Sequence, residues 1–263
     1  MAYAHRLQGS RYELKYVIPE SLVRPLRGFL SAYLVPDEHA DPENNWEYEV
    51  HSLYLDSPAL ELCRATVCGH KNRYKLRIRF YDVAGDSPVY FEIKRRVSEV
   101  ILKQRAKVRR SVVKELLDGR WPQADHLANG HGDGAWGEEL GALERFCQLR
   151  DRIGARGKVF VSYMREAHVT PSDNALRVTF DRAICGRAYR GAFDMARARA
   201  PVYPPIGGVV LELKFTDRFP VWMREMVRVF DLERRSMAKY VTCIQQLNTM
   251  PAELVGEYLD EYS

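Results

Sequence analysis

The 263-residue chain contains no hydrophobic run long enough to cross a membrane, because a transmembrane helix needs roughly 18 or more consecutive apolar residues. The first ten residues lack the apolar stretch of a signal peptide. Repeats of fixed period and low-complexity tracts are also missing, which excludes solenoid and fibrous architectures. We therefore expect a cytoplasmic globular protein with a single domain over residues 1–263.

Cysteine and histidine are too scattered to indicate a metal site or a disulfide framework. The five cysteines include no Cys-x-x-Cys pair, and the seven histidines form no His-x-His or His-Glu-x-x-His pattern. Reduced thiols are therefore expected. The hydrophobic fraction of 46% and the aromatic fraction of 11% are ordinary for a globular protein, which excludes disorder for most of the chain.

Short segments rich in Val, Ile, Tyr and Phe dominate two regions and predict strands. These segments are 11–17, 48–55, 74–81 and 89–96, followed by 159–169, 176–182 and 209–215. Helical spacing of apolar residues predicts helices over 19–34, 111–117, 140–153, 220–230 and 237–247, with a last short helix after Pro251. Asp56 precedes a Ser-Pro pair and is interpreted as a turn or strand-end residue.

The predicted strands share a short motif, Glu-x-Lys, that occurs three times. Because strand side chains alternate between faces, each Glu shares a face with its Lys, while the apolar residue between them points the other way. The three copies are Glu13-Leu14-Lys15, Glu92-Ile93-Lys94 and Glu212-Leu213-Lys214. The same alternation continues through the neighbouring positions.

One face of the predicted strands collects the positive charge. Its cations are Arg11, Lys15, Lys75, Arg77, Arg79, Lys94, Arg96, Arg165, Arg177 and Lys214. Its acidic residues are Glu13, Glu92, Asp181 and Glu212. The ten cations exceed the four carboxylates by six charges, whereas the whole chain carries a net charge of +5. The entire positive excess therefore lies on this face.

Two arrangements can explain such a face. It can be the ordinary solvated side of a half-buried antiparallel sheet. Alternatively, the strands close into an eight-stranded antiparallel β-barrel of the α+β class, with amphipathic helices packed around the outside and the charged face turned inward. Repetition of the pattern over at least five strands favours the second arrangement. So many cations in an enclosed space require an anionic partner.

Phosphate is the anion that suits these side chains, because Arg and Lys bind its oxygens through charge-assisted hydrogen bonds. The carboxylates suit a hard divalent cation such as Mg²⁺ or Mn²⁺. Glu212 is the preferred metal ligand. Glu13 and Glu92 are further candidates that can equally serve as salt-bridge partners of the cations. Ser236 is a candidate N-cap that would place Lys239 and free backbone N–H groups at a helix N-terminus, where anions bind.

Eight motifs in order resemble the VTC domain, the polyphosphate polymerase domain of the triphosphate tunnel (CYTH-like) superfamily. They are Arg11-Tyr-Glu-Leu-Lys-Tyr16, Ser52-Leu-Tyr-Leu-Asp56, Lys75-Leu-Arg-Ile-Arg-Phe-Tyr81, Phe91-Glu-Ile-Lys94, Ser162-Tyr-Met-Arg165, Leu176-Arg-Val-Thr-Phe-Asp181, Leu211-Glu-Leu-Lys214 and Ala238-Lys-Tyr240. The resemblance implies an eight-stranded tunnel and transfer of the ATP γ-phosphate onto a growing polyphosphate chain with Mn²⁺ or Mg²⁺. In yeast-type relatives the domain belongs to a membrane complex, so a membrane partner is a further expectation.

The resemblance also implies roles for individual residues. Phosphate contacts are implied for Lys15, Arg77, Arg79, Lys94, Tyr163, Arg165, Arg177 and Lys239, and metal binding for Glu212. The charged face adds Lys75, Arg96 and Lys214 to the phosphate and ATP ligands. We expect Arg77, Arg79, Lys94 and Glu212 to carry catalysis.

Three departures from the family pattern keep other functions open. Ala238 stands where the family usually has Ser, and Ser236 replaces a cation of the yeast-type enzymes, which is compatible with binding of polyphosphate or an inositol phosphate without turnover. Arg11 stands where hydrolase relatives have a Glu, which favours the polymerase over an inorganic triphosphatase. A nucleic-acid partner is not expected, because Tyr74, Phe80 and Phe91 lie on the face opposite the cations.

Overall fold

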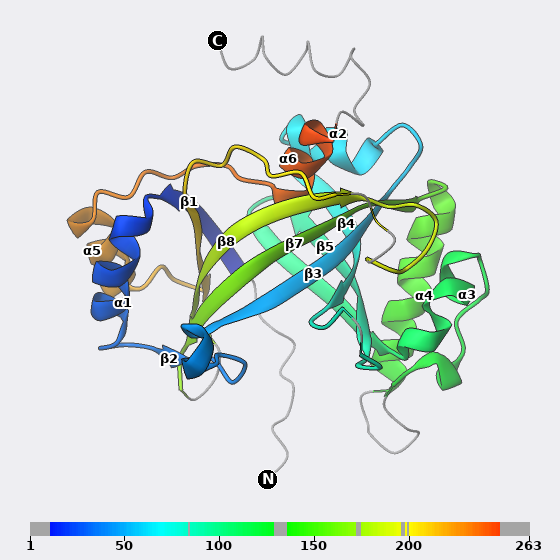
Figure 1. The fold of residues 1–263 in the computed structure, drawn as a ribbon, viewed down its shortest axis with the longest axis horizontal. Helices are drawn as coiled ribbons and strands as arrows, with labels where there is room; N and C mark the ends of the chain where they lie inside the picture. The colour runs from blue at the N-terminus through cyan, green and yellow to red at the C-terminus, as the bar shows by residue number, and fades with distance from the viewer. Residues whose placement is uncertain are drawn as a thin grey trace.

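The protein is described by a computed structural model that covers residues 11–83, 85–128, 136–171, 175–195, 198 and 200–247. Its central feature is one antiparallel sheet with the strand order β2-β7-β3-β4-β5-β6-β1-β9-β8 (Figure 1). The strands are β1 (Arg11–Ile18), β2 (Val35–Pro36), β3 (Glu47–Asp56), β4 (Asn72–Phe80), β5 (Val89–Val97), β6 (Val100–Val108), β7 (Arg156–Val169), β8 (Arg177–Ala188) and β9 (Val209–Thr216). The predicted last helix after Pro251 lies outside the described residues.

The sheet curls so that its two ends meet. β8, at one end of the order, also pairs with β7 over most of its length. On the other side of the ring, β1 and β6 share one register pair, Arg11 opposite Ile101. Since β6 begins at Val100, the rest of β1 runs past the start of its neighbour. The predicted large antiparallel sheet is therefore confirmed, but the predicted closure into an eight-stranded barrel is not, because β1 and β6 share only one register pair at this seam.

The two faces of the curled sheet differ in chemistry, as the alternation predicts. One face of the sheet carries Lys15, Arg77, Lys94, Arg165 and Lys214, and we call it the inner face. The opposite face is called the outer face. The outer face supplies most of the apolar core. This distribution follows from period-two alternation along each strand.

Helices cover the outer face on two sides of the sheet (Figure 1). The α-helices are α1 (Val23–Leu30), α2 (Glu61–Val67), α3 (Val113–Leu117), α4 (Trp136–Arg152), α5 (Val221–Val229) and α6 (Lys239–Gln246), and the 3-10 turns are η1 (Glu20–Leu22), η2 (Pro42–Asn44), η3 (Arg110–Val112) and η4 (Ala124–His126). α1 and α5 pack on β1, β8 and β9, while α3 and α4 pack on β4, β5 and β6. Among the described residues, no helix is long and apolar enough to span a membrane.

Local sequence explains where the two covering helices of the first side begin. Pro25 lies in the first turn of α1, where its missing N–H would have no helical partner. Pro220 is the N-cap of α5. Leu26 of α1 and Met223 of α5 are fully buried against the outer face. Burial of each such side chain stabilises the fold by about 1.5–3 kcal/mol.

α6 does not follow the prediction that all helices lie outside. Tyr240 of α6 stacks on Tyr54 with ring centroids 4.8 Å apart, and it belongs to the same apolar cluster as Val161 and Val210. These three partners alternate with outward-pointing residues and lie on the inner face. α6 therefore covers one end of the inner face.

Asp56 joins α2 and α6 to the end of β3. Its buried carboxylate accepts hydrogen bonds from the backbone N–H groups of Leu62 (2.9 Å) and Cys63 (2.8 Å) and from the hydroxyl of Tyr240 (2.7 Å). The predicted strand-end position is confirmed. The residue also satisfies N–H groups in the first turn of α2, which otherwise have no helical acceptor.

Three local features differ from the prediction. β6 and α2 are not predicted from the sequence. The predicted N-cap at Ser236 is wrong, because α6 begins at Lys239 with Ala238 as N-cap. The backbone N–H of Arg235 bonds to the carbonyl of Lys15 (3.0 Å), and Arg234 bridges to Tyr16 of β1. Pairing with β1 thus keeps this segment extended until Met237.

Candidate functional site

Two of the Glu-x-Lys motifs lie opposite each other on β1 and β9. The antiparallel register sets Lys15 opposite Glu212 and Glu13 opposite Lys214, an arrangement in which unlike charges stabilise the strand pair. Lys15 Nζ lies 3.1 Å from Glu13 and 3.4 Å from Glu212. The repeated motif therefore produces a lattice of alternating charges on the inner face.

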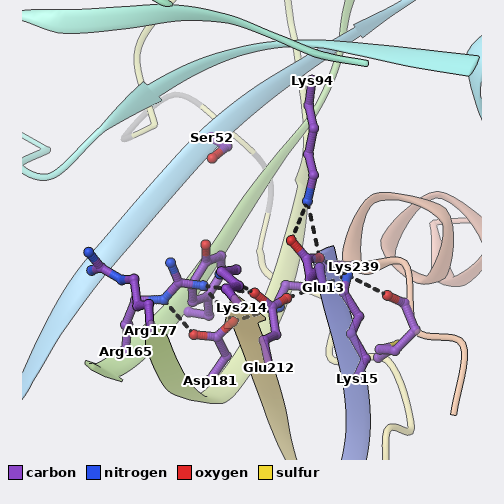
Figure 2. Close-up of polar contacts among 12 residues, drawn as sticks. Glu13, Lys15, Ser52, Lys94, Arg165, Arg177, Asp181, Glu212, Lys214 and Lys239 are labelled. Atoms are coloured by element: carbon purple, nitrogen blue, oxygen red, sulfur yellow. Dashed lines mark hydrogen bonds and ion pairs between the residues drawn. The ribbon is translucent and has the colours of Figure 1, made fainter. Parts of the chain in front are cut away.

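Glu212 is the centre of this lattice (Figure 2). Its carboxylate lies 2.6 Å from Lys214 Nζ, 2.9 Å from Lys239 Nζ and 3.7 Å from Arg165 Nη2, in addition to its contact with Lys15. Burial alone would raise the pKa of Glu212, but the cations of Lys214, Lys239 and Lys15 hold it well below its ordinary value. Glu212 is thus charged, and four cations converge on it.

Asp181 extends the cluster on β8. Arg165 donates two hydrogen bonds to its carboxylate, at 2.7 and 2.8 Å, and Lys239 Nζ lies 2.6 Å away. Lys239 therefore bridges Asp181 and Glu212. The predicted place of Lys239 at the start of the last described helix is confirmed, because it is the first residue of α6 and is buried on the inner face.

On β5 the inner face carries a further carboxylate, Glu92, which contacts cations of β4 and β6. It is fully buried and lies 2.6 Å from Arg77, 2.7 Å from Lys103 and 3.6 Å from Arg105. Burial would raise the pKa of Glu92, whereas Arg77 and Lys103 lower it well below its ordinary value. Its position among three cations is that of a salt-bridge partner.

A row of three lysines crosses the same strands. Lys75 is directly opposite Lys94, and Lys94 is directly opposite Lys103. Lys94 pairs with Glu13 at 2.8 Å and Lys103 with Glu92 at 2.7 Å, but Lys75 has no salt bridge within the described part of the chain. Burial, together with Lys15 and Lys94, lowers the pKa of Lys75 well below its ordinary value. Like charges opposite each other destabilise a strand pair, so this row calls for an anion.

Arg79 is a second inner cation without a carboxylate partner in the described ranges. It donates to the hydroxyl of Tyr163 at 3.0 Å and lies 3.5 Å from Ser52 Oγ. Its side chain is buried. The ring of Tyr163 also lies 5.1 Å from the guanidinium of Arg165 and from Lys239 Nζ. Tyr163 therefore connects Arg79 of β4 with the cations Arg165 and Lys239, which surround Glu212 of β9.

The remaining predicted site residues are Arg177, Arg96 and Arg11, and they do not share one location. Arg177 contacts the carboxylate of Asp37 and donates to the hydroxyl of Tyr48 at 3.1 Å. Arg96 is set apart from the cluster, because it bonds to Glu99 (3.0 Å) and to a backbone carbonyl of the β5–β6 turn. Nothing is described of the side chain of Arg11. The other predicted cations share the inner face.

Some residues on or beside the inner face are absent from the sequence prediction, among them Lys103, Arg105 and Asp37. Lys103 and Arg105 alternate with outward-pointing residues along β6, so period-two spacing could have identified them. Asp37 lies in the loop after β2, and no local pattern relates it to Arg177, 140 residues away. Lys103 and Arg105 add to the positive charge of the inner face.

Two carboxylates of the inner face lie close enough to be considered as ligands of one divalent cation. Glu212 and Asp181 approach a common point, because Lys239 Nζ lies within 2.9 Å of both. No group of three His, Cys, Asp or Glu side chains suited to a metal ion occurs within the described ranges. One or two carboxylates, with phosphate oxygens completing the shell, are a usual Mg²⁺ environment. Because Lys239 Nζ occupies that point, a cation held jointly by Glu212 and a phosphate ligand would have to displace the ammonium group of Lys239.

The solved structures that are similar to this chain include two at low identity. A candidate adenylate cyclase from Bacillus halodurans is 12% identical with a TM-score of 0.44, and the match covers 88% of this chain and 94% of that one. The PH1819 protein from Pyrococcus horikoshii is 12% identical with a TM-score of 0.40, and the match covers 91% of this chain and 98% of that one. A search of curated proteins found no match.

The decisive comparison is with protein families. The sequence model of the VTC domain matches residues 10–248, a range that includes every strand of the curled sheet and α6. The inner-face cations, the Glu-x-Lys motifs and Lys239 all fall inside it. The chain therefore belongs to the VTC domain family.

Proposed function

We propose that this protein binds the triphosphate of ATP on its inner face and transfers the γ-phosphoryl group to the end of an inorganic polyphosphate chain. Membership of the VTC family supports a function related to polyphosphate or triphosphate. The observation that carries the proposal is the lysine row of Lys75, Lys94 and Lys103, in which like charges lie opposite one another. A linear chain of phosphates would supply the negative charge that Lys75 lacks and would add to that of Glu13 beside Lys94 and of Glu92 beside Lys103.

The chemistry requires positioning and charge stabilisation more than covalent participation by the protein. A terminal oxygen of polyphosphate attacks the γ-phosphorus of ATP, the bond from that phosphorus to the β–γ bridging oxygen breaks, and ADP leaves. The attacking oxygen is already anionic, so no strong general base is needed. As fixed cations of the inner face, Arg77, Arg79 and Lys94 would stabilise the transferring group. A divalent cation at Glu212, Mn²⁺ or Mg²⁺, would neutralise further charge on the phosphate oxygens.

Sizing the phosphate product from ATP tests the reaction. Purified protein is incubated with γ-labelled ATP and Mn²⁺ or Mg²⁺, and the products are separated on a gel. The proposal predicts labelled chains longer than triphosphate. Free phosphate as the sole product would instead identify a hydrolase, with water as the acceptor. Tight binding without any product would identify a binding module and contradict the proposed transfer.

Binding of a phosphate chain is also expected to take up protons at pH 8. Burial lowers the pKa of Lys214 to about 7, against the opposing effect of Glu212, so the free protein holds this side chain mostly neutral at pH 8. A nearby polyanion favours the charged form and raises the pKa. The complex therefore binds more protons than the free protein above pH 7.

Calorimetry of tripolyphosphate binding in buffers of different ionisation enthalpy measures this uptake. Lys214→Arg keeps a permanent charge and should take up fewer protons than the wild type. Lys114→Arg, at an exposed position on α3, serves as the matched control and should behave as the wild type. Equal uptake in both variants would show that Lys214 does not face the ligand.

A further inference from the structure

Four aromatic rings form a connected cluster at the start of β3, the end of β4 and the start of β5. The ring of Tyr81 lies 6.0 Å from His39, 6.4 Å from Tyr48 and 6.0 Å from Tyr90, measured between centroids. His39 and Tyr48 are 5.7 Å apart. The fold and the proposed chemistry described above do not account for this cluster.

The cluster lies at the end of the inner face that is remote from α6. Tyr48 and Tyr54 share the inner face of β3, and Tyr54 stacks on Tyr240 of α6. Six residues of extended strand separate the two tyrosines, a distance of about 20 Å. α6 therefore closes one end, and the aromatic cluster marks the other.

Inner-face cations lie directly beside the cluster. Arg177 donates to the hydroxyl of Tyr48 at 3.1 Å, and Figure 2 shows it close to Arg165. Arg79 is the cross-strand partner of Tyr90. A ligand that touches the rings is thus one side chain away from two of the predicted phosphate ligands.

Tyr81 and His39 are the exposed residues of the four, whereas Tyr48 and Tyr90 are half-buried. The exposed fraction is 37% for Tyr81 and 58% for the side chain of His39. Tyr90 is covered by the guanidinium of Arg105, 3.4 Å from the ring centroid. Tyr48 is held through its hydroxyl by Asp37 and Arg177. Tyr81 and His39 therefore offer the free aromatic faces.

We propose that the base of a nucleoside triphosphate stacks on Tyr81 and His39, with its phosphates directed inward toward Arg177 and Arg79. The inference rests on the proposed function. It adds that the nucleotide enters at the end of the inner face remote from α6 and that Tyr81 and His39 hold its base. Stacking uses the face of a base and not its hydrogen-bonding edge, so it tolerates different bases. ATP and GTP should therefore bind with similar affinity.

The test compares nucleotide with tripolyphosphate, which has no base. Dissociation constants of ATP, GTP and tripolyphosphate are measured for the wild type, Tyr81→Ala, Tyr81→Phe and His39→Ala. Tyr81→Ala should weaken ATP and GTP binding about 5- to 150-fold, the range for loss of one base–aromatic stack, and leave tripolyphosphate binding within twofold. Tyr81→Phe keeps the ring and should bind ATP as the wild type does. Tyr203→Ala, at an exposed loop tyrosine, is the matched control.

The outcomes separate the inference from the proposed function. If tripolyphosphate binds but Tyr81→Ala and His39→Ala leave ATP affinity unchanged, the stacking site is wrong and the phosphate site stands. Equal weakening of ATP and tripolyphosphate would show that Tyr81 only supports the fold, which also overturns the inference. If the wild type binds neither ligand, the proposed function fails and the inference fails with it.

Discussion

Replacing Arg77 with alanine is expected to lower ATP-dependent polyphosphate synthesis by about 10²- to 10³-fold, the usual effect of removing one fixed group that stabilises developing charge. Arg77 lies on the inner face and is only 12% exposed. Its removal should leave the fold intact, because Glu92 keeps Lys103 at 2.7 Å and Arg105 at 3.6 Å. Initial rates at saturating ATP, together with the melting temperature, give the two readouts.

Arg228→Ala is the matched control for this substitution. Arg228 lies on the exposed side of α5 and has a side-chain exposure of 77%, so its loss should change neither rate nor stability. Arg77→Lys tests whether a point charge suffices. We expect it to recover little activity, since the planar guanidinium presents paired donors that an ammonium lacks. Wild-type rates in Arg77→Ala would contradict the catalytic assignment.

Replacing Glu212 with glutamine is expected to lower the free energy of unfolding by about 3 kcal/mol, the lower range for removing one partner of a buried ion pair. Lys15, Lys239 and Arg165 retain Glu13 or Asp181 as partners. Lys214 has no other salt bridge within the described residues, so its charge becomes uncompensated below pH 7, where this side chain is protonated. Denaturant unfolding of wild type and variant measures the difference.

The same variant distinguishes an electrostatic role from simple packing. A polyanion should restore the lost charge balance, so tripolyphosphate is expected to stabilise Glu212→Gln more than the wild type in the absence of metal. Metal-dependent synthesis should fall in the same variant. Glu225→Gln, at an exposed position on α5, is the control. A variant that is as stable as the wild type, or that gains nothing from tripolyphosphate, would contradict the role of Glu212 as the centre of the cation cluster.

Alternation along the strands was sufficient to collect the charged side chains on one face of the sheet, because a strand leaves each side chain only two directions. Lys15, Arg77, Lys94 and Lys214 were placed together by this rule alone, although they come from four different strands. The rule does not depend on knowing which strands are neighbours. Any curled sheet with this pattern brings its charged residues to one side.

Features that depend on contacts distant in sequence could not be predicted in this way. The turn between β5 and β6 contains Ser98 with a φ of 53°, where Gly or Asn is the usual signal, so β6 and its cations were missed. α2 begins after Leu60, which is not a capping residue, and Asp56 satisfies its first N–H groups instead. The late start of α6 follows from backbone pairing with Lys15, more than 200 residues away.

Titration of tripolyphosphate into wild type and Lys75→Met tests the central claim, that the inner-face cations bind a phosphate chain. Lys75 is a cation on the inner face without a salt bridge in the described part of the chain, and its neighbours Lys15 and Lys94 repel it. Replacement by an apolar side chain of similar length should therefore raise the melting temperature of the unliganded protein while weakening tripolyphosphate binding. We therefore predict that the melting temperature rises while the affinity for tripolyphosphate falls. Unchanged affinity in Lys75→Met, with the variant folded, would contradict the account.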